Sequence, residues 1–535
     1  MAVTETPPET AGATASAQDS ADAGPQSRPV PTGLAAVLGS GDHKVIGRLY
    51  IATSLLFGLV TVVLGGAFAL ESTAPATLEV FTTGTVFQFF TLYRVATVFL
   101  VALPLVIGVA MAIVPLQVGA RSIAFPRAAA GSYWAWLMGS LLLIASYAIG
   151  GGPGGGRTEG VHLWIGAMGV VVVAVLVAAL CLATTVLALR TGGLTLVRIP
   201  LYAWSVLVAA FLWLLTLPVL LGLLVLIYAD NRHGGGTGFG ANEDIYRRIT
   251  WLLRNPQIYV VAIPVLGFVA DVLATTARVR IGGRAGAQGA IAAFGVLGFG
   301  AFLVAAGTET YETPLLITMA ALAVLPVLAV AALAGDLFRR GTFRVTAGAL
   351  YAASALLVLL LATAAGALGA IPALETTDSI YDLGVSHAVV LASVIAGLGG
   401  LHWWSTKLGR QPADEFLGRL APLVLLVGAA TVVIPDLASG IAGTDAELRP
   451  DWTGGIEALN WVIVIGTVLL AAGLVLALAS LRPLAKRTDR EVPTDPWEGQ
   501  SLEWLAPSPP PLANFPADLP PITSAEPLVD QREET

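Results

Sequence analysis

The sequence predicts an all-α membrane protein with about twelve transmembrane helices. Of its 535 residues, 56% are hydrophobic and only 12% are charged, a balance far from that of soluble domains. The apolar residues form long runs, whereas a water-soluble domain shows short periodic stripes. A helix needs about 20 apolar residues to cross the roughly 30 Å of hydrocarbon in a bilayer. The sequence supplies such runs repeatedly.

Twelve apolar runs, separated by polar breaks, define the predicted helices. Frequent Gly and Ala within these runs suit the close packing of helices in lipid. No long segment remains for a soluble catalytic domain, so we expect any chemistry to take place inside the bundle. The runs cover residues 49–70, 95–115, 132–149, 163–189, 199–228, 256–276, 287–307, 314–335, 345–371, 383–404, 420–439 and 456–481.

The basic residues test this count, because Lys and Arg concentrate in the cytoplasmic loops of membrane proteins. Alternate loops do carry most of them, and the loops between are richer in acids. The exception is loop 229–249, which places three arginines on the outer side. The pattern predicts that both termini are cytoplasmic. The basic side carries Lys44, Arg48, Arg121, Arg127, Arg190, Arg198, Arg278, Arg280, Arg284, Arg339, Arg340, Arg344, Lys407, Arg410, Arg419, Arg482, Lys486, Arg487 and Arg490.

The chain divides into two tails and a transmembrane domain of residues 43–483. Residues 1–42 are rich in Ala, Pro, Ser, Thr and Gly and lack an apolar run, so we expect a disordered cytoplasmic tail. Residues 484–535 are polar and rich in Pro, which predicts an extended, non-helical and solvated cytoplasmic tail. The net charge of −7 gives no reason to expect a nucleic-acid partner. The single cysteine, Cys181, lies in an apolar run and is expected to be a core residue.

Several motifs resemble subunit I of the haem-copper cytochrome c oxidases. Residues 114–134 read VPLQVGARSIAFPRAAAGSYW, which is similar to the loop after the second helix in that family. The resemblance implies a twelve-helix bundle in the plasma membrane of a bacterium and a place in a respiratory complex. Other similar segments follow in the family's order, at residues 42–50, 198–204, 256–264, 403–410 and 495–515.

The resemblance also implies six histidine ligands, two on a low-spin haem, one on a high-spin haem and three on a copper ion. This chain has five histidines in total, so the full set cannot be formed. Of the family's ligand positions, only the second low-spin haem ligand keeps its histidine, at His387. The other five positions carry residues of different types: Tyr93 for the other low-spin haem ligand, Asn255 for a copper ligand, Val304 and Ala305 for an adjacent histidine pair, and Val385 for the first histidine of the motif that ends at His387.

Residues that the resemblance assigns to proton transfer and to anion binding are also replaced. Gln257 stands for the proton-passing glutamate and Ser122 for the aspartate at a channel entrance, and the channel lysine falls near Val330. The paired arginines that hold haem propionates in the family fall near residues 443–446, which read Gly-Thr-Asp-Ala. An anion site there would lack its cations.

Two interpretations of His387 stay open. It could ligate one residual haem, with Tyr93 on the opposite side, since tyrosinate serves haem iron in other proteins. Alternatively, it is a polar residue hydrogen-bonded between helices. We expect no copper. The remaining histidines, His43, His162, His233 and His402, fall at helix ends or in loops, where an interfacial or solvated histidine needs no special function.

Two acids and a tyrosine in predicted helices have competing explanations. Asp271 and Asp382 could line a proton or ion route, because acids in spanning segments are costly. Each also falls near a helix end, where its side chain could reach water. Tyr259 occupies the place of the family's catalytic tyrosine but lacks the histidine partner, and we expect it to pack between helices.

The leading hypothesis is a cytochrome c oxidase subunit I-like protein that lacks oxygen-reducing activity. It would act as a scaffold or interaction subunit, paired with a subunit II-like or other respiratory membrane protein. One alternative is a haem-binding electron-transfer or terminal oxidase subunit. Another is a proton or small-solute transporter that uses the vacated cofactor cavities, lined by Asp271, Asn255 and Gln257.

Overall fold

A computed structural model confirms the all-α class, since every regular element in the part that it describes is a helix. The first helix, α1 (Leu34–Leu38), belongs to a separate compact unit, Met1–Ser40. The expected disorder of the N-terminal tail falls mostly on residues outside the described part and stays a prediction. The described residues are 34–73, 81, 83–152, 156–233, 243–301, 313–376, 379–444, 455–486, 492–515 and 518–534.

Each of the twelve predicted runs coincides with a helix. In the described part of the chain, eleven helices are long and apolar enough to cross a membrane. The twelfth, α9, reaches the last described residue before a gap. The helices are α2 (His43–Glu71), α3 (Thr83–Ala96) continuing into α4 (Leu103–Gln117), α5 (Pro126–Ala148), α6 (Thr158–Ala188), α7 (Leu201–Arg232), α8 (Glu243–Ala277), α9 (Arg284–Ala301), α10 (Thr313–Arg340), α11 (Ala347–Gly369), α12 (Ile380–Trp403), α14 (Glu415–Ile441) and α15 (Gly455–Ser480).

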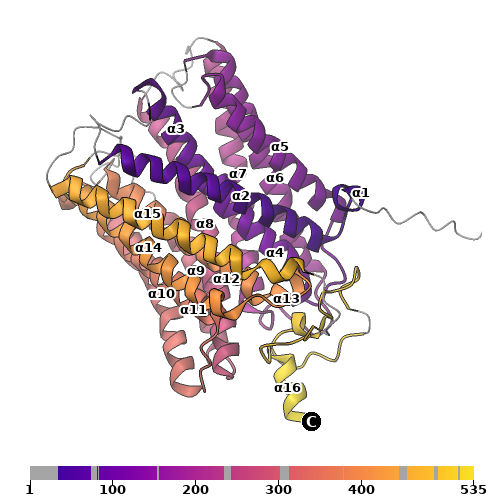
Figure 1. Cartoon of the computed structure of the whole chain (residues 1–535). Helices are drawn as coiled ribbons and strands as arrows, with labels where there is room; N and C mark the ends of the chain where they lie inside the picture. Colours follow the sequence, from indigo (N-terminus) through magenta and orange to yellow (C-terminus); the bar gives the residue numbers. More distant parts are fainter. Residues whose placement is uncertain are drawn as a thin grey trace, which may run out of the picture. The chain divides into compact units, whose positions relative to one another are not determined.

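Helices that follow one another in the chain pack side by side, as in the pairs α5–α6, α7–α8, α11–α12 and α14–α15 (Figure 1). The last of them, α15, packs against α2, so the two ends of the transmembrane domain are neighbours. Helices α4 and α12 contact each other and lie in the interior, and every residue of α4 is buried. The interior of the bundle is therefore built from helices far apart in the sequence.

Helices α3 and α4 are joined by one wide turn, the π-helical segment Thr97–Ala102. The N–H of Leu103 donates to the carbonyl of Val98, five residues earlier. Pro104 explains this local change, because a proline ring clashes with the carbonyl four residues before it in a regular α-helix. Such widened turns often occur at functional sites, and Thr97 and Val101 line the pocket described below.

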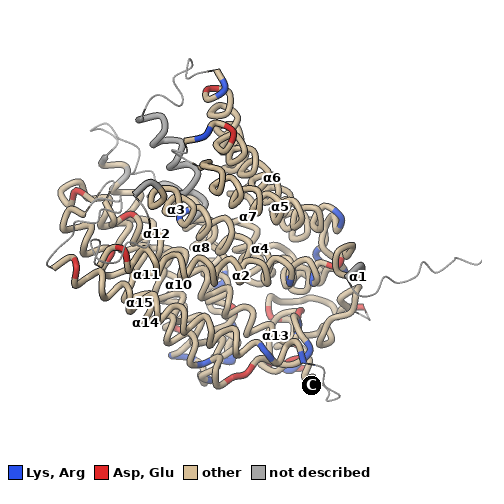
Figure 2. Tube along the Cα trace, turned by 45° about the horizontal axis from the view of Figure 1, so that its top comes forward, with Lys and Arg blue, Asp and Glu red and all other residues tan. Residues whose placement is uncertain are grey.

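The C-terminal segment, residues 492–534, lies at the end of the bundle where many Lys and Arg residues gather (Figure 2). The prediction that it is non-helical and solvated was wrong. It contains the short helices η5 (Leu502–Leu505) and α16 (Pro527–Glu534). The indole ring of Trp497 stacks on that of Trp403, with the ring centres 4.9 Å apart. Aromatic residues spaced along the Pro-rich segment therefore attach it to the helices.

Polar contacts add to this attachment. Asn514 is buried, and its amide donates to the carbonyl of Ala120 (2.8 Å) while its oxygen accepts from the Lys44 ammonium (2.9 Å). The Glu503 carboxylate accepts from the Gln117 amide (3.1 Å), and burial raises the pKa of this carboxyl. Arginines between the end of α8 and the start of α9 also form ion pairs with the C-terminal segment, among them Arg284 with Glu526 (2.9 Å).

Lys407, in the short helix α13 (Ser405–Leu408), is bound directly to the C-terminal segment. Its buried ammonium donates to the carbonyls of Thr494 (2.8 Å) and Ala506 and to the Ser508 hydroxyl (3.1 Å). Burial lowers the pKa of this lysine to about 8. The ammonium joins two stretches of the segment to the end of α12.

We predict that Lys407→Met loosens the C-terminal segment. The variant leaves two carbonyls without a donor, which should lower the local opening free energy by about 3 kcal/mol. Hydrogen exchange at residues 492–515 of the full-length protein measures this change. Lys486→Met, at an exposed lysine, is the control. Equal exchange in the two variants would contradict the role given to Lys407.

Candidate functional site

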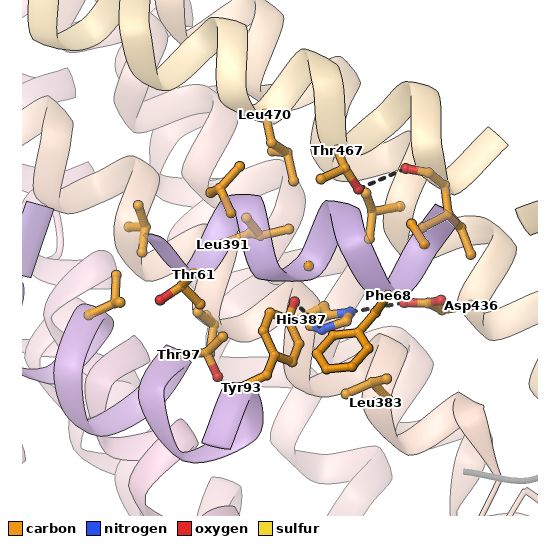
Figure 3. A pocket seen from close by; sticks show the side chains of 18 of the residues that line it. Thr61, Phe68, Tyr93, Thr97, Leu383, His387, Leu391, Asp436, Thr467 and Leu470 are labelled. Carbon is orange, nitrogen blue, oxygen red and sulfur yellow. Dashed lines mark hydrogen bonds and ion pairs between the residues drawn. The ribbon is translucent and has the colours of Figure 1, made fainter. Parts of the chain in front are cut away.

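Three helices bring Tyr93, His387 and Asp436 together inside the bundle (Figure 3). The Tyr93 hydroxyl lies 3.0 Å from Nε2 of His387, and Nδ1 of His387 lies 2.9 Å from Oδ2 of Asp436. The three residues come from α3, α12 and α14. They form a continuous hydrogen-bonded chain across the helix interface, which is the structural role that the second interpretation of His387 assigns to it.

The chemistry of the imidazole fixes the direction of one of these bonds. A carboxylate only accepts hydrogen bonds, so Nδ1–H of His387 donates to Asp436. Nε2 then accepts from the Tyr93 hydroxyl when the imidazole is neutral and donates to the phenol oxygen when it is protonated. Asp436 orients the ring in both cases. The arrangement can pass a proton between the phenol and the imidazole.

The wall opposite Tyr93 is one face of α2. Residues spaced three or four apart share a helix face, and this face presents Leu55, Gly58, Thr61, Gly65 and Phe68 to the pocket. A Cβ atom at Gly65 would lie 3.2 Å from the ring of Tyr93, which is tighter than ordinary van der Waals contact. Glycine at this position lets the tyrosine ring approach α2 and reach His387.

A pocket of about 160 Å³ adjoins the three residues. Most of its lining is aliphatic or aromatic, and its polar groups are few. The carboxylate of Asp436, which is 3% exposed, and the hydroxyl of Tyr93 are among them. Phe68 lies edge-on to Phe90 and to Tyr93, with both pairs of ring centres 5.7 Å apart. The result is an apolar space with aromatic rings and one acid at its wall.

The geometry does not fit a haem held between Tyr93 and His387. Two ligands on opposite faces of one iron are separated by two bonds of roughly 2 Å each, yet the Tyr93 oxygen and His387 Nε2 are in direct hydrogen bonding at 3.0 Å. The pocket volume points the same way. A cavity of about 150 Å³ accommodates one benzene, and the macrocycle of a haem is far larger.

The positions that the family resemblance assigns to copper, and the position Gln257 that it assigns to proton transfer, are less completely described. The side chains of Asn255 and Gln257, and residues Val304 and Ala305 altogether, lie outside the described part of the chain. Within the described part, no group of three or more His, Cys, Asp or Glu side chains is placed to hold a metal ion.

Two of the other histidines differ from expectation. His43 and His402, expected to be interfacial or solvated, are each 1% exposed. The Nδ1–H of His43 donates to the carbonyl of Met111 (2.8 Å), and Nε2–H of His402 donates to the carbonyl of Asp414 (3.2 Å). Each is buried because the chain folds over the helix end, His43 beneath the C-terminal segment and His402 beneath the start of α14. His233 is exposed, as expected.

Asp271 was expected to reach water or to line a route, but it binds backbone groups. Its two carboxylate oxygens accept from the N–H groups of Leu201 (3.0 Å) and Tyr202 (2.8 Å) at the start of α7. The first N–H groups of a helix lack partners within it, and a carboxylate is favourable there. Asp271 is also absent from the lining of the pocket beside His387. Its position indicates a role in joining α8 to α7.

Tyr259 and Asp382 occupy ordinary structural positions. The ring of Tyr259, on α8, is buried and lies 5.4 Å from the ring of Phe294 on α9. A Cβ at Gly298 would overlap this ring, so α9 carries glycine where the tyrosine packs. Asp382 lies in the first turn of α12, where the helix dipole favours a negative charge.

Asp436 is the member of the site that the sequence analysis missed. It falls inside the predicted run 420–439, so the criterion that singled out Asp271 and Asp382 applies to it equally. An acid within an apolar run, with a histidine available on another run, is the signal that could have identified the pair.

Comparisons with known proteins agree with the fold and with the motifs. The family model described as cytochrome c and quinol oxidase polypeptide I matches residues 45–469. Cytochrome c oxidase subunit 1 of Bacillus subtilis (strain 168) is 27% identical, over 91% of this chain and 81% of its own length. Subunit 1 of the cytochrome bo(3) ubiquinol oxidase of Buchnera aphidicola subsp. Schizaphis graminum is also 27% identical, over 80% of this chain and 69% of its own length. A haem-copper terminal oxidase dimer solved by cryo-EM has a TM-score of 0.67 at 14% identity, over 86% of both chains.

We predict that the His387–Asp436 pair behaves as a unit in unfolding experiments. His387→Leu leaves a buried carboxylate without its donor and should destabilise the protein by about 3 kcal/mol. The double variant His387→Leu/Asp436→Leu removes both polar groups, and it should be more stable than His387→Leu alone. Thermal unfolding of the purified protein in detergent compares the variants. Additive losses would show that the two side chains are not coupled.

Proposed function

This chain belongs to the cytochrome c and quinol oxidase polypeptide I family, and from that premise we propose that it is a member without oxygen-reducing activity of its own. It serves as a scaffold or interaction subunit of a respiratory membrane complex. The observation that carries the proposal is the direct hydrogen bond between Tyr93 and His387. Two side chains that the family would place on opposite faces of an iron are bonded to each other here.

The number of histidines also supports the proposal that the chain has no oxygen-reducing centre. Iron and copper in this family depend on imidazole nitrogen, and five histidines cannot furnish six ligands. Those of the described part do not converge on one point, since His43 and His402 each bind a backbone carbonyl elsewhere in the bundle. Asn255, Val304 and Ala305 stand at three of the copper positions by sequence, and neither an alkyl side chain nor a carboxamide replaces imidazole on copper.

The proposed scaffold role assumes that the fold can persist without the metal ligands. Helix packing determines the bundle, whereas oxygen chemistry needs a handful of ligands. Helix α12 packs on α14 and α2 packs on α15, and large apolar side chains such as Val63 and Leu215 are exposed. These surfaces suit lipid and a neighbouring membrane subunit. We place the protein in a bacterial plasma membrane with both termini in the cytoplasm, and a subunit II-like protein is the partner that the family relationship favours.

A single residual haem is the second candidate function, because Tyr93 and His387 do face each other on separate helices. It requires their hydrogen bond to break and the pocket to expand. Electron transfer through that haem would then be the activity.

Optical and metal analysis separates these functions. We predict that the full-length protein, purified from native membranes, shows no haem absorption band and no stoichiometric copper, because its ligand set does not support either. Subunit 1 of the Bacillus subtilis oxidase, purified in parallel, is the positive control. One haem per chain would favour the electron-transfer alternative. Copper and two haems together with oxygen uptake would overturn the proposed function.

A further inference from the structure

The pocket beside His387 has the size of a single aromatic ring. Its volume is about 160 Å³, close to the roughly 150 Å³ that holds one benzene in an apolar cavity. Its walls include Phe68, Phe90 and Tyr93, and the ring of Phe68 lies edge to face with each of the other two. Aromatic rings prefer such edge-to-face or offset neighbours, and each pair contributes about 0.5–1.5 kcal/mol beyond burial. These three rings offer a bound aromatic ring the neighbours that it prefers.

The same pocket carries one strong acceptor. Asp436 lines it, is 3% exposed, and uses one carboxylate oxygen, Oδ2, on His387. Among the described residues, no hydrogen bond to the other oxygen, Oδ1, is present. A buried carboxylate oxygen is stabilised by a donor. A ligand with a hydroxyl group on an apolar ring would supply that donor and fill the pocket at the same time.

We propose that this pocket binds a neutral phenol, either free or as the head of a longer apolar molecule. The phenol O–H donates to Asp436, and the ring packs among Phe68, Phe90 and Tyr93. The Asp436–His387 pair keeps the carboxylate in place, and the Tyr93 hydroxyl completes the polar end. The inference rests on the proposed function, because a haem between Tyr93 and His387 would leave no room for the ring.

A photoreactive phenol tests the proposal on the full-length protein in phosphatidylcholine nanodiscs. We use 4-(trifluoromethyl-diazirinyl)phenol, with mapping of the labelled peptides. Labels should appear on the pocket faces of α2 and α12, and unlabelled phenol should suppress them more strongly than cyclohexanol. A long-chain alkylphenol serves as a second competitor. If the alkylphenol suppresses labelling at a lower concentration than phenol does, the natural ligand is a phenol with a long apolar chain. If phenol is the stronger competitor, the natural ligand is a free phenol.

Two variants and a matched control make the test specific. Gly58→Leu places a side chain in the pocket, where the nearest atom to a Cβ is a methyl group of Val101 at 3.4 Å. It should abolish the labelling. Gly222→Leu makes the same change on the exposed face of α7, where no atom lies within 4 Å, and labelling should persist. Asp436→Asn weakens the acceptor, so half-maximal competition should need about tenfold more phenol.

The outcomes separate the two proposals. Equal labelling of the Gly58→Leu and Gly222→Leu proteins, or competition unchanged in Asp436→Asn, would overturn phenol binding. Optical spectra of the same samples report on haem independently. No labelling and no haem band would refute phenol binding alone, whereas a haem band would refute the proposed function as well.

Discussion

The structure depends on one constraint, which is that a polar group inside a bilayer is costly unless it finds a partner within the protein. Helices satisfy the backbone, and the side chains then have to be satisfied one by one. His387 is bonded on both nitrogens, and Asp271 accepts two backbone N–H groups at the start of α7. In each case the partner comes from a different helix. Polar residues therefore mark the places where helices are held in register.

This constraint also explains how an oxidase scaffold can persist when its ligands change. In a haem protein, a histidine buried among helices is paired with iron. When the opposite ligand is tyrosine, the phenol can form a hydrogen bond with the imidazole directly. The buried imidazole nitrogen then has a partner without a metal. Gly65 of α2 leaves room for the ring of Tyr93 in the position from which its hydroxyl reaches His387. The hydrogen bond between Tyr93 and His387 thus links α3 directly to α12.

Much of the fold could be predicted from the sequence because spanning helices are long apolar runs. Every predicted run overlaps a helix in the described part of the chain, and the family resemblance identified Tyr93 and His387 as opposite neighbours. The third member of the site, Asp436, could have been singled out as an acid within an apolar run, but its partner depends on which face of α14 meets α12, and the run does not reveal that. Asp271 was recognised as unusual, but its partners are backbone N–H groups of another helix, which no side-chain pattern indicates.

The C-terminal segment shows the opposite failure. Its Pro and polar residues predicted a solvated tail, since composition measures the average of a segment. The structure depends instead on a few positions: Trp497 stacks on Trp403, Asn514 reaches Lys44, and the ammonium of Lys407 binds two carbonyls. These contacts close the basic end of the bundle with residues more than a hundred positions apart in some cases. A segment that satisfies buried charges in this way contributes to the integrity of the transmembrane domain. The amino-acid composition changes near residue 483, but the residues beyond it still pack against the helices.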